Sequence, residues 1–473
     1  MKHEQFSAET EPDRNDLQRL VRVVSLLSLA LLLISICGAV ILSYMGKSFT
    51  ENVSFKVDDS WCKTGLEGIG RHCFGDFGLA YYRGYMSSAY QPHNYAAANT
   101  PVTAVFFEAL RLLPYNLSLL LYLLCSLACL AFPIYRETKH LAIEVRCLMI
   151  VGVGLCGAGS LAAIDRGNHI AFLVPLVYLY LCAIEEHKWK TARNLLVVIS
   201  LLKFWGIIFI IPLVFNRRVR DVVITILQTL LISMISIAFF PGKFWAKVDS
   251  MIQMVTNKDY SNSIAGYSVS FFGLTRRTAC YLSTRSWCNT KTFVGTFWTS
   301  TAALLILTVL VLVVFLVLQL TGSRGRRRLL LLSPLLGITC IPDAPRYNTV
   351  LLIVIVALVI RFAHLDAQAG KFSPESRLSS FTVLLGLSCF VSLIPITLRT
   401  EQVTRFSSGT GEGPTLARLD LWLVPFSFAV VLTYAFLDAI RLRFRQNSHD
   451  RDSERDREMS SNSHICSKNA LED

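Results

Sequence analysis

Long apolar stretches recur along the chain, from near its start to near its end. They occupy residues 23–44, 116–135, 147–164, 169–184, 222–240, 294–320, 378–398 and 421–437. A helix needs about 20 apolar residues to cross the hydrocarbon core of a bilayer, so each stretch is predicted to form a membrane-spanning helix. The pattern predicts an all-α polytopic membrane protein.

The composition leaves no room for a sizeable soluble domain, because 53% of the residues are hydrophobic and only 17% are charged. We expect one transmembrane domain over residues 1–440. Residues 446–473 are rich in Ser, Asp, Arg and Glu, which predicts a disordered cytoplasmic tail. The first apolar run is longer than the core of a secretory signal and no small-residue cleavage site follows it, so we interpret it as the first span.

Basic residues between the apolar stretches predict the orientation. They cluster at residues 14–22, 136–146, 188–193, 217–220, 324–328 and 441–445. Lys and Arg near helix ends favour the cytoplasmic side, which predicts cytoplasmic termini and outer loops at 46–100, 241–293 and 399–420. The net charge of +13 is divided among these clusters and forms no continuous face, so nucleic-acid binding is not expected.

One apolar stretch, residues 194–215, has basic clusters at both ends and cannot cross once without moving a cluster outside. A re-entrant hairpin of two short helices that meet near Lys203 resolves this conflict. The same interpretation applies to residues 329–341 and 350–360, which are separated by 342–347. Irregular backbone at membrane depth is tolerated where it lines a cavity. We therefore expect about 10 spans plus short re-entrant helices around one outward-facing cavity.

Four of the 13 cysteines lie in predicted outer loops, two in each of two loops, while eight lie in apolar stretches and one in the tail. These four are Cys62, Cys73, Cys280 and Cys288. The placement favours local disulfides, Cys62 to Cys73 and Cys280 to Cys288, in an oxidising compartment. Four free thiols remain the alternative.

Several polar motifs lie between residues 76 and 220. The first outer loop holds Asp76 shortly before paired aromatics, then Asn99-Thr100-Pro101 and an amphipathic run that ends at Leu113-Pro114. Further on come Asp165-Arg166-Gly167-Asn168-His169, Leu201-Leu202-Lys203 and Ile211-Pro212. In this order and spacing the chain resembles glycosyltransferase family 87, although the family's usual Tyr-Pro-Pro is Asn99-Thr100-Pro101 here.

The resemblance implies an integral-membrane enzyme with a GT-C-like fold that uses a polyprenyl-phosphate sugar. It implies a mannosyltransferase of the cell membrane with an extracytoplasmic active site and a lipid or glycan acceptor. No metal and no cofactor are expected. Sugar transfer needs a base for the acceptor hydroxyl and cations for the departing phosphate, and Asp76 and Lys203 suit these two roles. The candidate donor-phosphate and substrate residues are Lys203, Arg166, Asn168, Tyr81, Tyr82, Arg346 and Tyr347.

Less specific interpretations stay open for each of these residues. Asp76 is also placed to cap a loop helix, and Lys203 to extend its ammonium to the membrane interface. Asp165 and Arg166 also suit a paired surface turn, and His169 a hydrogen-bonded interfacial histidine. At the level of the whole chain, a transporter or lipid-linked-glycan flippase also uses broken helices and charged cavity residues, whereas a membrane scaffold needs no charged hairpin apex.

Overall fold

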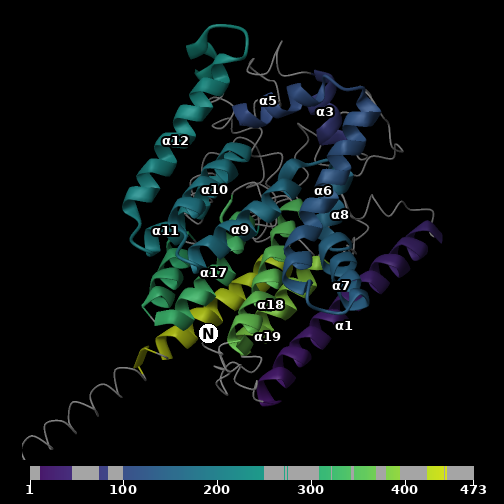
Figure 1. The fold of residues 1–473 in the computed structure, drawn as a ribbon, viewed down its shortest axis with the longest axis vertical. Helices are drawn as coiled ribbons and strands as arrows, with labels where there is room; N and C mark the ends of the chain where they lie inside the picture. The colour runs from purple at the N-terminus through teal and green to yellow at the C-terminus, as the bar shows by residue number, and fades with distance from the viewer. Residues whose placement is uncertain are drawn as a thin grey trace, which may run out of the picture.

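The computed structural model describes residues 11–44, 74–83, 100–249, 308–320, 322–341, 346–368, 380–394 and 423–441, with a few single positions besides. All regular structure in this part of the chain is helical, as Figure 1 shows. The expected tail at 446–473 and most of the three predicted outer loops lie outside it.

Within the described residues, five helices are long and apolar enough to cross a membrane, so the expected ten spans are not confirmed. These are Gln18–Ile41 within α1 (Glu11–Tyr44), α6 (Tyr115–Thr138), α12 (Val219–Ala238), Tyr347–Gln368 and Leu423–Arg441. The helical segments Ile143–Leu155 and Ala158–Arg166 form a sixth span if the pair, bent by 62°, is taken as one. Five further apolar helices in the described residues have only 10–17 residues.

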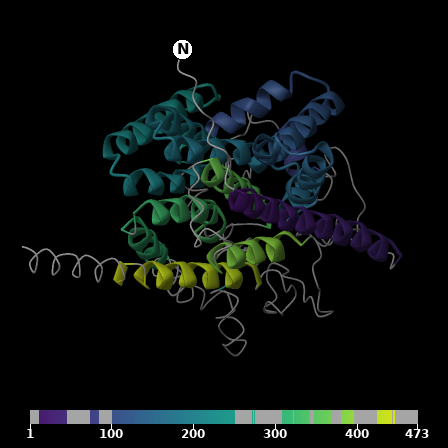
Figure 2. The same cartoon turned by 60° about the horizontal axis from the view of Figure 1, so that its bottom comes forward.

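The centre of the protein is made by α9 (Leu173–Glu185) and α18 (Leu352–Gln368), which are buried on most of their surface. α9 packs against α6, α18 and α10 (Trp189–Leu202). α1 and α12 lie at opposite edges of Figure 1 and expose rows of large apolar side chains. An apolar helix exposed in this way suits contact with lipid. In Figure 2 the helices from α3 (Gly75–Arg83) to α12, blue to teal, lie mostly on one side of the later helices, green to yellow.

The chain reverses direction at Lys203, as the pattern of basic clusters predicts. α10 ends at Leu202, Lys203 is extended (φ −141°, ψ 125°), and η5 (Phe204–Ile210) and α11 (Ile211–Phe215) follow. The Arg218 guanidinium lies 4.9 Å from the Trp189 ring centroid, so the two ends of the segment meet. The segment therefore enters and leaves the protein at the same end.

The second expected hairpin differs in one respect. α17 (Gly322–Thr339) and α18 are joined through η7 (Arg346–Leu351), but α18 continues to Gln368 and does not stop near residue 360. It continues because the charge of Arg361 is matched by carboxylates of other helices, at 2.8 Å from Glu185 and 2.6 Å from Glu186. The apex, residues 342–345, is outside the described part.

The two interrupted segments pack against each other. Ring atoms of Trp205 and Phe209, both in η5, lie 3.1 Å from the position that a Cβ on Gly337 would occupy. The Asn348 side chain donates a 3.1 Å hydrogen bond to the Gly337 carbonyl and so ties η7 to α17. The breaks at Lys203 and before η7 thus belong to one neighbourhood.

Candidate active site

The Asp76 carboxylate is held on both of its oxygens. Asp76 lies in the first turn of α3 (Gly75–Arg83), which sits near the top of Figure 1. Arg166 forms a salt bridge with Oδ1, and the Asn168 amide donates a 2.8 Å hydrogen bond to Oδ2. The side chain of Asn168 also caps η4 (His169–Phe172) by accepting from the Ile170 N–H at 3.1 Å. Two residues far from Asp76 in sequence therefore fix its orientation.

Gly167 makes this arrangement possible. It ends α8 (Ala158–Arg166) in the left-handed conformation, with φ 60° and ψ 39°. A Cβ at this position would lie 2.8 Å from the Phe77 Cβ and 3.2 Å from the Phe74 Cα, so only glycine lets α3 approach so closely. The Phe74 N–H donates to the Asp165 carbonyl at 2.6 Å, and the Tyr122 hydroxyl donates to the Gly167 carbonyl at 3.0 Å.

Aromatic side chains form the support behind α3. Phe77 is fully buried, with its ring centroid 4.9 Å from that of Tyr122 and 6.0 Å from that of Tyr81. The Tyr81 hydroxyl donates a 2.6 Å hydrogen bond to the Leu113 carbonyl. Tyr82 stacks on Tyr115, with centroids 4.9 Å apart. Tyr81 is therefore held by the turn after α5 (Pro101–Leu110), and both tyrosines remain partly exposed.

Lys203 lies between α10 and η5, outside the helices long enough to span a membrane, and near enough to Asp76 for their charges to interact. Burial lowers the pKa of Lys203 to about 8, and the negative charge of Asp76 acts in the opposite direction. The side chain nonetheless keeps some solvent-accessible surface. A lysine that is largely enclosed by protein but still partly accessible is suited to bind an anion.

Two threonines hold the backbone before Lys203: Thr100 from the Asn99-Thr100-Pro101 motif, and Thr103, which the sequence did not single out. Thr100 caps α5 (Pro101–Leu110), and its hydroxyl donates to the Leu201 carbonyl. The Thr103 hydroxyl donates to the Leu202 carbonyl at 2.9 Å. A Thr-Pro step is a recognisable helix start, but the pattern does not reveal that the same hydroxyls reach another helix.

The structure describes only some of the remaining predicted site residues. Tyr347, in η7, is half-buried and close enough to Arg166 to interact with it electrostatically. Arg346 begins η7, and its side chain lies outside the described part of the chain, as do Cys62, Cys73, Cys280 and Cys288. The described residues contain no group of three or more His, Cys, Asp or Glu placed to hold a metal ion.

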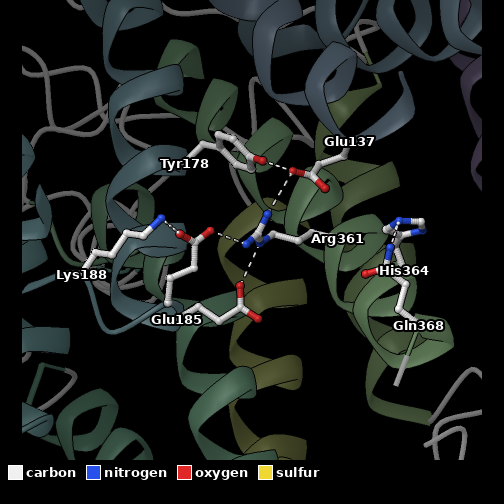
Figure 3. Close-up of polar contacts among 8 residues, drawn as sticks. Glu137, Tyr178, Glu185, Lys188, Arg361, His364 and Gln368 are labelled. Atoms are coloured by element: carbon white, nitrogen blue, oxygen red, sulfur yellow. Dashed lines mark hydrogen bonds and ion pairs between the residues drawn. The ribbon is translucent and has the colours of Figure 1, made fainter. Parts of the chain in front are cut away.

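The charged groups of the predicted cytoplasmic side meet at the other end of the helices. Figure 3 shows Arg361 between Glu137 of α6 and Glu185 of α9, with Tyr178 bonded to Glu137. Nearby, Arg218 pairs with Asp221 at 2.7 Å. α6 runs from Tyr115, beside Tyr82, to Glu137, so the Asp76 site and these clusters lie at opposite ends.

Comparison with known proteins gives one match. The family model described as glycosyltransferase family 87 matches residues 98–342, slightly more than half of the chain. The matched range contains Arg166, Asn168 and Lys203 and begins after Asp76. No curated protein and no solved structure matches the chain.

Proposed function

This chain belongs to glycosyltransferase family 87, and we propose that it transfers a sugar from a polyprenyl-phosphate donor to a hydroxyl of a lipid or glycan. The resemblance favours mannose as the sugar and the extracytoplasmic side of the cell membrane as the location. The observation that carries the proposal is the grouping of Asp76, Arg166, Asn168 and Lys203 at the end of the helices opposite the basic clusters.

Asp76 is the proposed general base. Arg166 and Asn168 each engage one carboxylate oxygen, and every carboxylate oxygen has two lone pairs. A lone pair therefore remains on each oxygen to accept the proton of the acceptor hydroxyl.

The reaction then needs one displacement. The acceptor oxygen forms a bond with the anomeric carbon of the sugar while the hydroxyl proton passes to Asp76. The bond from that carbon to the phosphate oxygen breaks, and the polyprenyl phosphate leaves with the electron pair. A single displacement inverts the anomeric configuration. Lys203 offsets the charge that develops on the departing phosphate.

The other site residues take supporting roles in this proposal. Arg166 and Asn168, predicted to bind donor phosphate or substrate, orient Asp76. Tyr347, Arg346 and the aromatic pair Tyr81 and Tyr82 border the donor site. The expected bundle of about 10 spans with both termini cytoplasmic needs several of the shorter apolar helices to span the membrane as well.

A transfer assay tests the proposal directly. Purified protein in proteoliposomes is supplied with polyprenyl-phosphate mannose labelled in the sugar, together with a lipid extract as acceptor. We expect labelled product that depends on Asp76 and Lys203 and carries an inverted anomeric centre. Movement of the labelled lipid across the bilayer without product would instead indicate a flippase.

A further inference from the structure

His169 is a buried histidine that the proposed reaction does not use. It follows Asn168 directly and begins η4, and only 4% of its surface is exposed. The Phe107 ring stands edge-on to the imidazole, with centroids 6.1 Å apart. Its Nε2 atom is buried and has no hydrogen-bond partner among the residues that the structure describes. This differs from the satisfied interfacial histidine that the sequence alone allows.

The hydrogen bond made by the ring determines whether Nε2 is a donor or an acceptor. The imidazole makes a hydrogen bond to the backbone of Leu202, and because Nε2 has no partner this bond involves Nδ1. A neutral ring that donates Nδ1–H to a carbonyl presents a lone pair at Nε2. Nε2 is therefore an acceptor in need of a donor.

Lys203 provides a hydrogen-bond donor near the Nε2 acceptor of His169. It follows Leu202 in the chain, and its ammonium is near enough to act electrostatically on His169. No direct hydrogen bond joins the two side chains. The ammonium can only donate hydrogen bonds, whereas this Nε2 can only accept one. A group that satisfies both must accept on one side and donate on the other, and a hydroxyl does both.

We propose that His169 and Lys203 bracket a hydroxyl of the donor's sugar, with His169 Nε2 as the acceptor that distinguishes a glycosylated polyprenyl phosphate from the bare lipid phosphate. The proposal rests on the proposed function, because the ligand is its donor. It makes His169 a specificity-determining residue. A site built to bond a hydroxyl leaves a buried atom unpaired when that hydroxyl is missing, which is a strong source of discrimination.

Binding measured without any acceptor tests the inference. The probes are a short-chain polyprenyl phosphate and the same lipid carrying mannose, titrated into protein in nanodiscs. His169→Phe keeps a flat ring but removes the lone pair, and His169→Gln restores an acceptor oxygen. We expect the preference for the mannosyl lipid, taken as the ratio of the two Kd values, to fall about tenfold in His169→Phe and to recover in part in His169→Gln.

Two further variants make the result specific. Ser118 is also buried with an unpartnered hydroxyl, in α6, so Ser118→Ala should leave the preference unchanged. Lys203→Ala should weaken both lipids, since it removes the cation at the phosphate. An unchanged preference in His169→Phe overturns the inference, as does equal loss of both lipids in a folded His169→Phe. If wild-type protein binds neither lipid, the proposed function itself fails.

Discussion

Asp76 and Arg166 form an ion pair that is mostly shielded from solvent, so the two residues must be tested together. Their side chains are 22% and 15% exposed. Removing only the carboxylate leaves a guanidinium without its counter-charge, which lowers stability whatever the role in catalysis. A loss of activity in Asp76→Asn therefore needs a control for folding.

The first prediction is that Asp76→Asn reduces sugar transfer by about 100-fold to 10,000-fold, because the acceptor hydroxyl loses its base. The double variant Asp76→Asn with Arg166→Gln replaces the ion pair by two neutral amides. It should recover the melting temperature of the wild type while staying inactive. Glu108 pairs with Arg111 in α5, at 2.9 Å, and Glu108→Gln should keep its activity. Full activity in the double variant would remove Asp76 from the mechanism.

The second prediction concerns the pH dependence of donor use, which follows from the lowered pKa of Lys203, about 8. Below this pH the side chain is a cation that attracts the donor phosphate, and above it the side chain becomes neutral. We expect kcat/KM for the donor to fall by about tenfold for each pH unit above the pKa. Arginine stays charged at these pH values, so Lys203→Arg should shift the fall to higher pH.

The measurement is kcat/KM for the polyprenyl-phosphate sugar between pH 6.5 and 10, set at one ionic strength. Thr103→Val serves as the matched variant. It removes the hydroxyl bond to Leu202 without changing charge, so it should lower the rate and keep the pH of the fall. An identical alkaline fall in wild type and Lys203→Arg would assign the titration to another group.

At the scale of the helices, Arg361 joins three elements at the end opposite the site. Its guanidinium lies 3.6 Å from Glu137, 2.8 Å from Glu185 and 2.6 Å from Glu186. These contacts tie α18 to the ends of α6 and α9. The same three elements reach the site: α6 carries Tyr122, α9 follows η4, and α18 follows η7.

The third prediction is that Arg361→Met destabilises the protein by about 3 to 5 kcal/mol, because it leaves the mostly buried carboxylates of Glu137 and Glu185 without the counter-charge of Arg361. Adding Glu137→Gln and Glu185→Gln should restore most of the lost stability. Arg327 pairs with Asp366 in a more exposed position, so Arg327→Met should cost about 1 kcal/mol or less. The free energy of unfolding is measured by SDS titration. Equal effects of the two arginine variants would contradict the prediction.

The same helices show what sequence patterns reveal about this fold. The break at Lys203 was predictable, because basic clusters on both sides of a single apolar run are a local signal. The length of α18 was not predictable from the apolar run, because the residues that neutralise Arg361 lie about 175 positions away in the chain. Apolar length alone also does not report where a helix bends or stops, as at the 62° bend between Ile143–Leu155 and Ala158–Arg166.

The candidate site also contains residues that the sequence predicts and partners that only the structure reveals. Asp76 and Lys203 are recognisable from their motifs and from the cost of a charge in an apolar segment. Their partners are non-local: Arg166 reaches Asp76 across 90 positions, and Thr100 reaches Leu201 across 101. Pairing of this kind comes from packing, as does the solitary Nε2 of His169. Sequence therefore indicated the chemistry of the site, while the structure indicates which groups are already engaged.

For the whole molecule, the hairpin at Lys203 determines which end of the protein carries the basic clusters and which end carries the Asp76 site. The contact between Trp189 and Arg218 puts positions 188 and 217 at one end of the protein. Leu112, between α5 and α6, is 85% exposed and lies at the other end, near the Asp76 site. Basic clusters favour the cytoplasm, so the first end should face inward and the site outward.

The fourth prediction is that cysteines at 188 and 217 are labelled only after the membrane is permeabilised, whereas a cysteine at 112 reacts in intact cells. Each is introduced singly into a variant without the 13 native cysteines, and an impermeant maleimide is applied from outside. Because 188 and 217 are neighbours in space, they must agree with each other in either orientation. Labelling of both from outside, with 112 protected, would invert the protein and place the Asp76 site in the cytoplasm. Disagreement between 188 and 217 would mean that the segment between them crosses the membrane once. Lys203 would then lie within a span and not at the hairpin apex that the proposed donor site requires.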